Sequence, residues 1–258
     1  MRRPIAAVAV MWVIVVLSLS ACSGGSAAPA TSGPSATPAA PRTTAAQGFT
    51  VNGTRAVLPN GSQDTSAQAV GAACDRAQLA SDRNLGNEIA DGFAAANFPA
   101  AASLLRHFLA GAGTGVDYPA GSRISALARA SDEFRVLNGQ VQAAVARQLK
   151  VGDTQVRLPA GQLPTVTFSE TTSDLYWSFR GTQGLTVTGS GSRKNGRYVG
   201  TLTYVIRDSY GFPVDDTLGG FGPPMRYLQT VCGAPQHAGG AHWFPDTITV
   251  TVPFDQPA

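Results

Sequence analysis

The hydrophobic pattern of this chain changes its period once, close to Asp153, and the change limits the folds open to it. Between about Thr65 and Lys150, apolar residues recur three or four positions apart, which predicts helices with one buried face. From Asp153 onward, apolar and polar residues alternate, which predicts strands joined by turns. Helices first and strands later favour an α+β fold, in which N-terminal helices pack on a C-terminal antiparallel sheet within a single domain.

The start and stop signals of two helices are explicit. Pro99 suits the first position of a helix, and Gly111 suits the end of that helix. Ser131 is a candidate N-cap for the next helix, which Gly152 would end. The glycine and proline content of residues 111–121 predicts a loop between the two.

Five segments after the helices alternate and are predicted strands: Gln155–Leu158, Leu163–Phe168, Leu175–Arg180, Leu185–Arg193 and Arg197–Arg207. Asn195-Gly196 is typical of a type I′ hairpin turn between the last two. Asn52-Gly53 predicts a small hairpin near the start of the ordered chain by the same argument. The remaining predicted elements are a helix over Phe221–Val231 and a final strand whose buried face carries Ile248, Val250 and Val252.

The first residues have the pattern of a secretory signal peptide. Arg2 and Arg3 precede an apolar run from Ile5 to Leu19, and small residues follow this run. A membrane-spanning anchor is the alternative interpretation, but a span needs about 20 apolar residues, and this run is shorter. The pattern therefore favours a segment that is cut off during export.

The residues that end this run narrow the prediction. Leu19-Ser20-Ala21-Cys22 resembles the lipobox of bacterial lipoproteins, and the alanine-rich, lysine-poor composition is similar to that of high-GC Gram-positive (actinobacterial) lipoproteins of no assigned activity. The resemblance implies that residues 1–21 are removed and that Cys22 carries a diacylglyceryl group, with palmitate as a typical chain. Two acyl chains would anchor the exported protein stably to the outer face of the cytoplasmic membrane.

The segment after Cys22 predicts a tether rather than a fold. Residues 22–48 consist mainly of Ser, Thr, Pro, Ala and Gly, and they bury too little apolar surface to offset the entropy of ordering. Residues 49–258 then remain for the α+β domain. The net charge is +3 for the whole chain and about +1 without Arg2 and Arg3, which argues against nucleic acid as a partner.

The cysteine count predicts one disulfide. With Cys22 lipidated, Cys74 and Cys232 remain as an even pair in an oxidising compartment. Two buried free thiols are the alternative. A Cys-x-x-Cys pair is absent from the sequence, so neither a redox pair nor a zinc knuckle is indicated.

Familiar catalytic motifs are absent from the sequence, including Gly-x-Ser-x-Gly, His-Glu-x-x-His, Ser-x-x-Lys and the Walker A loop. Two loops collect the candidate acid–base residues, which are Asp208, Tyr210, Asp215, Asp216, His237 and His242. Carboxylates close together can divide into an acid and a base, and histidine titrates near neutral pH. Turn capping and solvation are the competing explanations for the same residues. A metal site would need a third ligand beside the two histidines, so we predict neither a metal nor a cofactor.

These observations lead to two functional hypotheses. The first is a non-catalytic module of the cell envelope that binds an unknown ligand or protein partner. Its contacts would be exposed aromatic side chains, because aromatics concentrate in binding hot spots; the candidates are Tyr210, Phe212, Phe221 and Trp243. The alternative is a cell-envelope hydrolase that uses the Asp and His residues of the 208–216 and 236–243 loops.

Overall fold

The structure is a computed structural model that describes residues 47–56, 73–212, 219–234 and 237–258. These residues belong to one compact unit, Thr44–Ala258. The predicted signal peptide, Cys22 and most of the tether lie outside the described residues, as do Asp215 and Asp216. Within the described ranges, the helices are too short or too polar to cross a bilayer.

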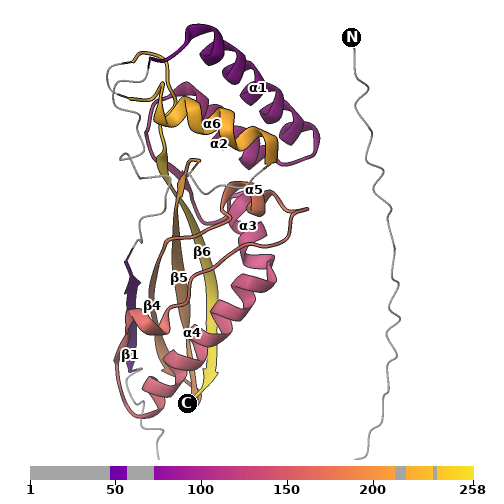
Figure 1. Cartoon of the computed structure of the whole chain (residues 1–258). Coiled ribbons are helices and arrows are strands. Elements are labelled where there is room, and N and C mark those ends of the chain that lie inside the picture. Colours follow the sequence, from indigo (N-terminus) through magenta and orange to yellow (C-terminus); the bar gives the residue numbers. More distant parts are fainter. Residues whose placement is uncertain (1–46, 57–72, 213–218, 235–236) are drawn as a thin grey trace, which may run out of the picture. The chain divides into compact units, whose positions relative to one another are not determined.

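The described residues form an α+β fold, which confirms the predicted class (Figure 1). The strands are β1 (Gly48–Arg55), β2 (Val116–Tyr118), β3 (Gln155–Leu158), β4 (Gly184–Lys194), β5 (Arg197–Tyr210) and β6 (Phe244–Pro257). The α-helices are α1 (Arg76–Ala95), α2 (Pro99–Ala110), α3 (Arg123–Ala130), α4 (Asp132–Lys150), α5 (Asp174–Ser178) and α6 (Gly222–Thr230). Two short 3₁₀ helices, η2 (Ala160–Gln162) and η3 (Gly219–Phe221), complete the set.

The strands form one sheet in the order β2-β6-β5-β4-β1-β3. Its centre is antiparallel, as predicted, because β1 pairs with β4, β4 with β5, and β5 with β6 in opposite directions. The two edge strands run parallel to their neighbours, β3 beside β1 and β2 beside β6. Parallel neighbours need a long crossover, and helices α1–α4 supply it between β1 and β3.

One face of the sheet carries the core. Helix α4 runs along the lower part of the sheet in Figure 1, while α1, α2 and α6 gather at the upper end of the strands. Phe134 of α4 packs edge-on against Tyr204 of β5, with the ring centroids 5.1 Å apart. The Tyr204 hydroxyl donates to Asn138 Oδ1 of the same helix at 2.8 Å, so this buried tyrosine is both packed and hydrogen-bonded.

Several predicted boundaries are confirmed. Pro99 is the first residue of α2, and Gly111 ends it with a left-handed φ of 73°. The Ser131 hydroxyl accepts a hydrogen bond from Phe134 N, which caps α4. Asn195 and Gly196 both have positive φ, at 48° and 72°, as a type I′ turn between β4 and β5 requires.

Other predicted elements are wrong. Leu175–Arg180 is not a strand, because most of it lies in the short helix α5, which the Ser173 hydroxyl caps. Leu163–Phe168 forms no strand either, although Leu163, Val166 and Phe168 are buried. The predicted loop after α2 contains the edge strand β2.

The predicted hairpin at Asn52-Gly53 is also wrong, because β1 continues straight through both residues. A side chain at Gly53 would place its Cβ 2.6 Å from the Cβ of Leu158 on the neighbouring strand. Glycine therefore stands at this position so that β3 can approach β1 closely, and no turn is involved.

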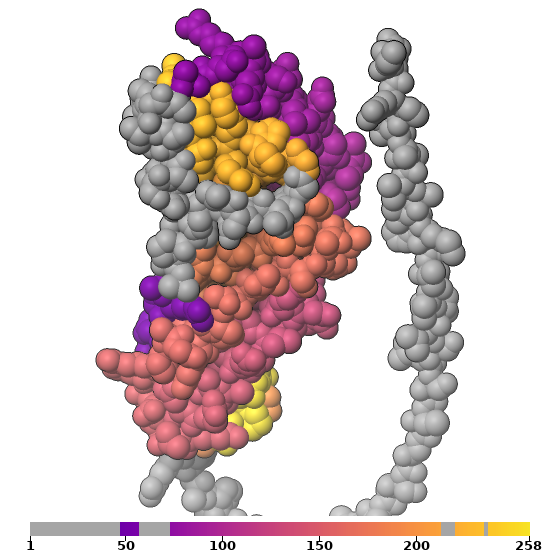
Figure 2. Space-filling view, viewed as in Figure 1, coloured from indigo at the N-terminus to yellow at the C-terminus, as the bar shows by residue number. Residues whose placement is uncertain are grey.

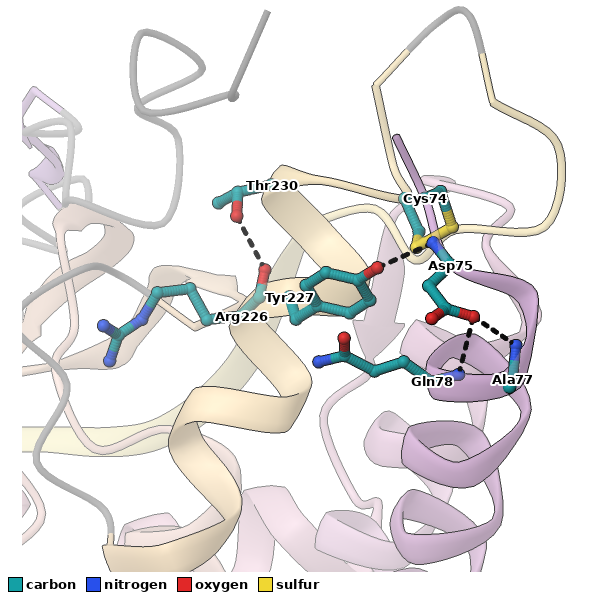
Figure 3. The surroundings of a disulfide bond; sticks show 8 residues. Cys74, Asp75, Ala77, Gln78, Arg226, Tyr227 and Thr230 are labelled. Atoms are coloured by element: carbon teal, nitrogen blue, oxygen red, sulfur yellow. Dashed lines mark hydrogen bonds between the residues drawn. A yellow bond between two sulfur atoms is a disulfide. The ribbon is translucent and has the colours of Figure 1, made fainter. Parts of the chain in front are cut away.

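The predicted Cys74–Cys232 disulfide is present (Figure 3), with the two Cα atoms 5.0 Å apart. Beside it, Asp75 N–H donates to the Tyr227 hydroxyl at 2.9 Å, and Asp75 Oδ1 accepts from Ala77 N at 2.7 Å to cap α1. The bridge thus ties the start of α1 to the end of α6. It closes a separation of 158 residues, which corresponds to at most about 5 kcal/mol of lost chain entropy in the unfolded state.

Candidate functional site

Two aspartates face each other inside the fold. Asp208 of β5 and Asp246 of β6 are register partners in the antiparallel ladder. The even-numbered side chains of both strands point to the core. Asp208 lies two residues after the buried Ile206, and Asp246 lies two residues before the buried Ile248, so both carboxylates are on this face. Their exposed fractions are 8% and 1%, so the sheet holds a carboxylate pair within its buried face.

The surroundings of this acid pair favour its protonated form. Burial raises the pKa of Asp208 to about 8, although the backbone N–H groups of Ser209 and Gly181 oppose the shift. Burial, and then the charge of Asp208, raise the pKa of Asp246 well above its usual value. Neither Asp246 oxygen has a hydrogen bond of good geometry among the described residues, and only the backbone N–H of Asp246 itself opposes the rise of this pKa. Two close carboxylates in such a place retain a proton near neutral pH.

Tyr118 lies near the acid pair, and Asp174 lies near Tyr118. Burial, together with the charges of Asp246 and Asp174, raises the pKa of Tyr118 on β2 to about 12. Asp174 is itself buried, and its carboxylate accepts hydrogen bonds from Ala100 N at 3.0 Å and Ala101 N at 2.9 Å. It therefore caps the start of α2, where a negative charge is favourable.

The remaining predicted site residues have other surroundings. Tyr210 is half-buried and stacks on Phe244, with the ring centroids 5.4 Å apart. His237 is half-buried, and its backbone N–H donates to Ala234 O at 2.9 Å. His242 is exposed and lies beside the Gly111 turn at the end of α2. The register partner of Asp208 is Asp246, while the predicted residues Asp215 and Asp216 lie outside the described residues.

The predicted aromatic contact surface is wrong in part. Phe212 is only 4% exposed and packs against Phe108 and Phe221, with ring centroids 5.1 and 6.1 Å away. Phe221 is partly buried against the core, and Trp243 is half-buried. Phe212 therefore belongs to the core, and Tyr210 and Phe221 extend it outward.

The sheet offers a different surface on the face that points away from the core. Its side chains are exposed or half-buried and mostly carry hydroxyls; they include Thr50, Thr54, Thr186, Thr188, Ser190, Thr201, Thr203, Thr247, Thr249 and Thr251. One row crosses four strands in register, from Asn52 through Thr188 and Thr203 to Thr251. The hydroxyls of Thr203 and Thr251 lie 3.5 Å apart. We call this surface the hydroxyl face.

The sequence analysis predicted neither the Asp208–Asp246 pair nor the hydroxyl face, although the sequence contains a signal for each. Asp246 continues the alternation of Ile248, Val250 and Val252 backwards along the strand, which places it on the buried face. The threonines between these residues mark the opposite face by the same rule.

In the described part of the chain, no three His, Cys, Asp or Glu side chains form a group that could hold a metal ion. The hydroxyl face presents mostly uncharged hydrogen-bonding groups, with the Arg207 guanidinium donating to the Thr186 hydroxyl at 2.6 Å. Searches against protein-family models, curated proteins and solved structures found no match for this chain.

Proposed function

We propose that this protein is a lipid-anchored, exported module of the cell envelope that binds a neutral, polyhydroxylated polymer through its hydroxyl face without catalysis. The observation that carries the proposal is the in-register row from Asn52 to Thr251 across four strands. The lipid anchor at Cys22 is supported by the lipobox resemblance of Leu19–Cys22.

The chemistry of the hydroxyl face fits a glycan. Each threonine can donate and accept a hydrogen bond through its hydroxyl, and its methyl group can contact the C–H groups of a sugar ring. Neighbouring strands lie about 4.8 Å apart, and alternate residues along a strand lie about 6.8 Å apart, so hydroxyls recur on a regular lattice. A polymer with repeated hydroxyls could engage many such groups together, and weak single contacts would then add up.

Glycan binding is tested with one substitution on this face. Thr203→Lys places a long charged side chain in the middle of the four-strand row, and we expect it to weaken binding to chitin oligosaccharides, a neutral glycan, at least about tenfold, which is about 1.4 kcal/mol. Val136→Lys is the matched control, since Val136 is 61% exposed on the far side of α4. Binding is measured by isothermal titration calorimetry. Equal binding by the wild-type protein and Thr203→Lys would refute the role of this face.

Lipidation is tested separately. In the source cell, the mature protein should start at a Cys22 that carries a diacylglyceryl thioether, and Cys22→Ala should accumulate as an unprocessed precursor. Intact-mass spectrometry of both proteins decides the question. A wild-type protein with an unmodified Cys22 would refute the anchor and leave the glycan test unaffected.

One observation favours the alternative, an envelope hydrolase. A carboxyl group with a pKa of about 8, as for Asp208, retains its proton at neutral pH, as a general acid must. A substrate would have to reach two side chains that are 8% and 1% exposed. Turnover of a labelled peptidoglycan substrate that Asp208→Asn abolishes would establish this function and overturn the non-catalytic proposal.

A further inference from the structure

Several segments that are distant in sequence meet at one end of the sheet. The Tyr198 hydroxyl at the start of β5 donates to Leu149 O in the last turn of α4, at 2.8 Å. Arg193 N–H, in the β4–β5 hairpin, donates to Gln47 O at 3.1 Å, so the chain enters β1 at the same place. This end lies away from α1, α2 and α6 and is the lower end of the folded part in Figures 1 and 2.

Positive side chains concentrate at this end. Six of the sixteen Lys and Arg residues in the described part of the chain lie there, against two of its thirteen Asp and Glu residues, Asp153 and Asp255. All six are exposed; they are Arg147, Lys150, Arg157, Arg193, Lys194 and Arg197. Both lysines of the whole protein are among them. We call this group the basic end, and the rest of the described part is close to neutral.

Intramolecular contacts use only part of this charge. Arg197 forms an exposed ion pair with Asp255 at 2.6 Å, and the Arg193 guanidinium lies 5.9 Å from the centre of the Tyr198 ring. Val151 follows Lys150 directly and is 80% exposed, more than any other large apolar side chain in the described ranges. The basic end therefore combines solvated cations with an apolar side chain at its tip.

We propose that the basic end docks on the anionic headgroups of a phospholipid bilayer and holds the folded unit upright beside the membrane that anchors it. The proposal rests on the lipid anchor proposed above, since Cys22 lies only 25 positions before Gln47. The chain therefore leaves its anchor and enters the fold at the basic end. With this end on the membrane, the strands would stand away from the bilayer and the hydroxyl face would remain open along its length.

Charge and apolarity together favour a bilayer over a soluble polyanion. Lys and Arg near an anionic surface each favour binding by about fivefold, the equivalent of about 1 kcal/mol. Val151 gains from contact with a bilayer interface, whereas a soluble polyanion offers it no apolar contact. A short tether also raises the effective concentration of the basic end at the membrane, so weak docking suffices.

The test uses the full-length chain with Cys22→Ala, whose uncleaved signal segment inserts into vesicles as in an exported precursor. Only protein that floats with the vesicles is measured, so that the outcome does not depend on lipidation. A fluorophore on Val151→Cys reports proximity to headgroup-attached quenchers, and the same label on Val136→Cys is the positional control. In vesicles containing phosphatidylglycerol we expect strong quenching at position 151 and weak quenching at 136. High salt and pure phosphatidylcholine should both abolish it.

Charge variants make the test specific. Neutralising Arg147, Lys150 and Lys194 to Gln should lower the docking equilibrium constant about 100-fold, while the same change at Arg76, Arg106 and Arg129 on α1–α3 should leave it within about twofold. Equal quenching at positions 136 and 151, or in anionic and neutral vesicles, would overturn the proposal. So would displacement of the docked end by equimolar polyphosphate, which would assign the basic end to soluble polyanions.

Discussion

A chain that stops at Phe244 should fail to fold. The truncation removes β6 beyond its first residue, and with it the whole ladder that this strand forms with β5. Ile248, Val250 and Phe254 are fully buried, and Val252 is 5% exposed. Each such side chain contributes about 1.5–3 kcal/mol, so the four together approach the whole stability of a typical domain, about 5–15 kcal/mol. Circular dichroism during heating should show no cooperative transition.

Two controls separate this effect from general damage. Deleting residues 255–258 removes the last three residue pairs of the β5–β6 ladder and the exposed Arg197–Asp255 ion pair, which is worth at most about 1 kcal/mol. No fully buried side chain is lost, so the melting temperature should fall only slightly. Val250→Asp and Thr251→Asp place the same charge on opposite faces of β6. The first should abolish folding and the second should leave it nearly intact. A cooperative transition in the Phe244 truncation near the wild-type temperature would show that β6 is dispensable.

The elements that the sequence predicted correctly are those with local signals. Helix α4 has a capping serine and a continuous apolar stripe, and the β4–β5 hairpin has Asn195-Gly196, whose positive φ angles only a few residue types accept easily. The final strand was predictable because its apolar residues alternate without interruption. In each of these cases, the residues that decide the structure are close together in the chain.

The errors arise where distant contacts decide the structure. Leu163, Val166 and Phe168 are buried against the core without joining the sheet, so their spacing reflects burial rather than strand pairing. Asn52-Gly53 has the composition of a turn, but its glycine serves the approach of Leu158. Neither fact can be read from a single segment, because each depends on contacts with distant parts of the chain; Leu158, for example, follows Gly53 by about 100 residues.

The candidate site, too, has one property that the sequence predicts and one that depends on distant contacts. Periodicity alone places Asp208 and Asp246 on the buried faces of their strands. It does not say that they are register partners, because 33 residues and helix α6 separate β5 from β6. The predicted aspartate–histidine site drew on residues of two loops, whereas Asp208 and Asp246 are brought together by the pairing of two strands.

The acid pair should make the protein more stable in mild acid than in mild base. The pKa of Asp208 is about 8 in the folded state and near 3.9 in an unfolded chain, so the folded state binds more protons between these values. The stabilisation from this proton is complete below about pH 4 and is lost as the pH rises through about 8. The raised pKa of Asp246 acts in the same direction. Most acid-labile proteins show the opposite trend, because their paired carboxylates have lowered pKa values.

Asp246→Asn isolates this effect, because it removes one charge from the pair and keeps the shape of the side chain. At pH 8 we expect the variant to gain a few kcal/mol and to melt about 5–10 °C higher than the wild-type protein, since it removes the carboxyl group whose pKa is raised by burial and by the charge of Asp208. At pH 4.5 the two proteins should melt together, because the wild-type pair is already protonated. Asp153→Asn, at an exposed position, should follow the wild-type curve throughout. The measurement is differential scanning calorimetry between these pH values. The prediction is wrong if the wild-type melting temperature falls on acidification and Asp246→Asn is less stable than the wild-type protein at pH 8. That result would mean that the pair is ionised and is held by partners outside the described residues.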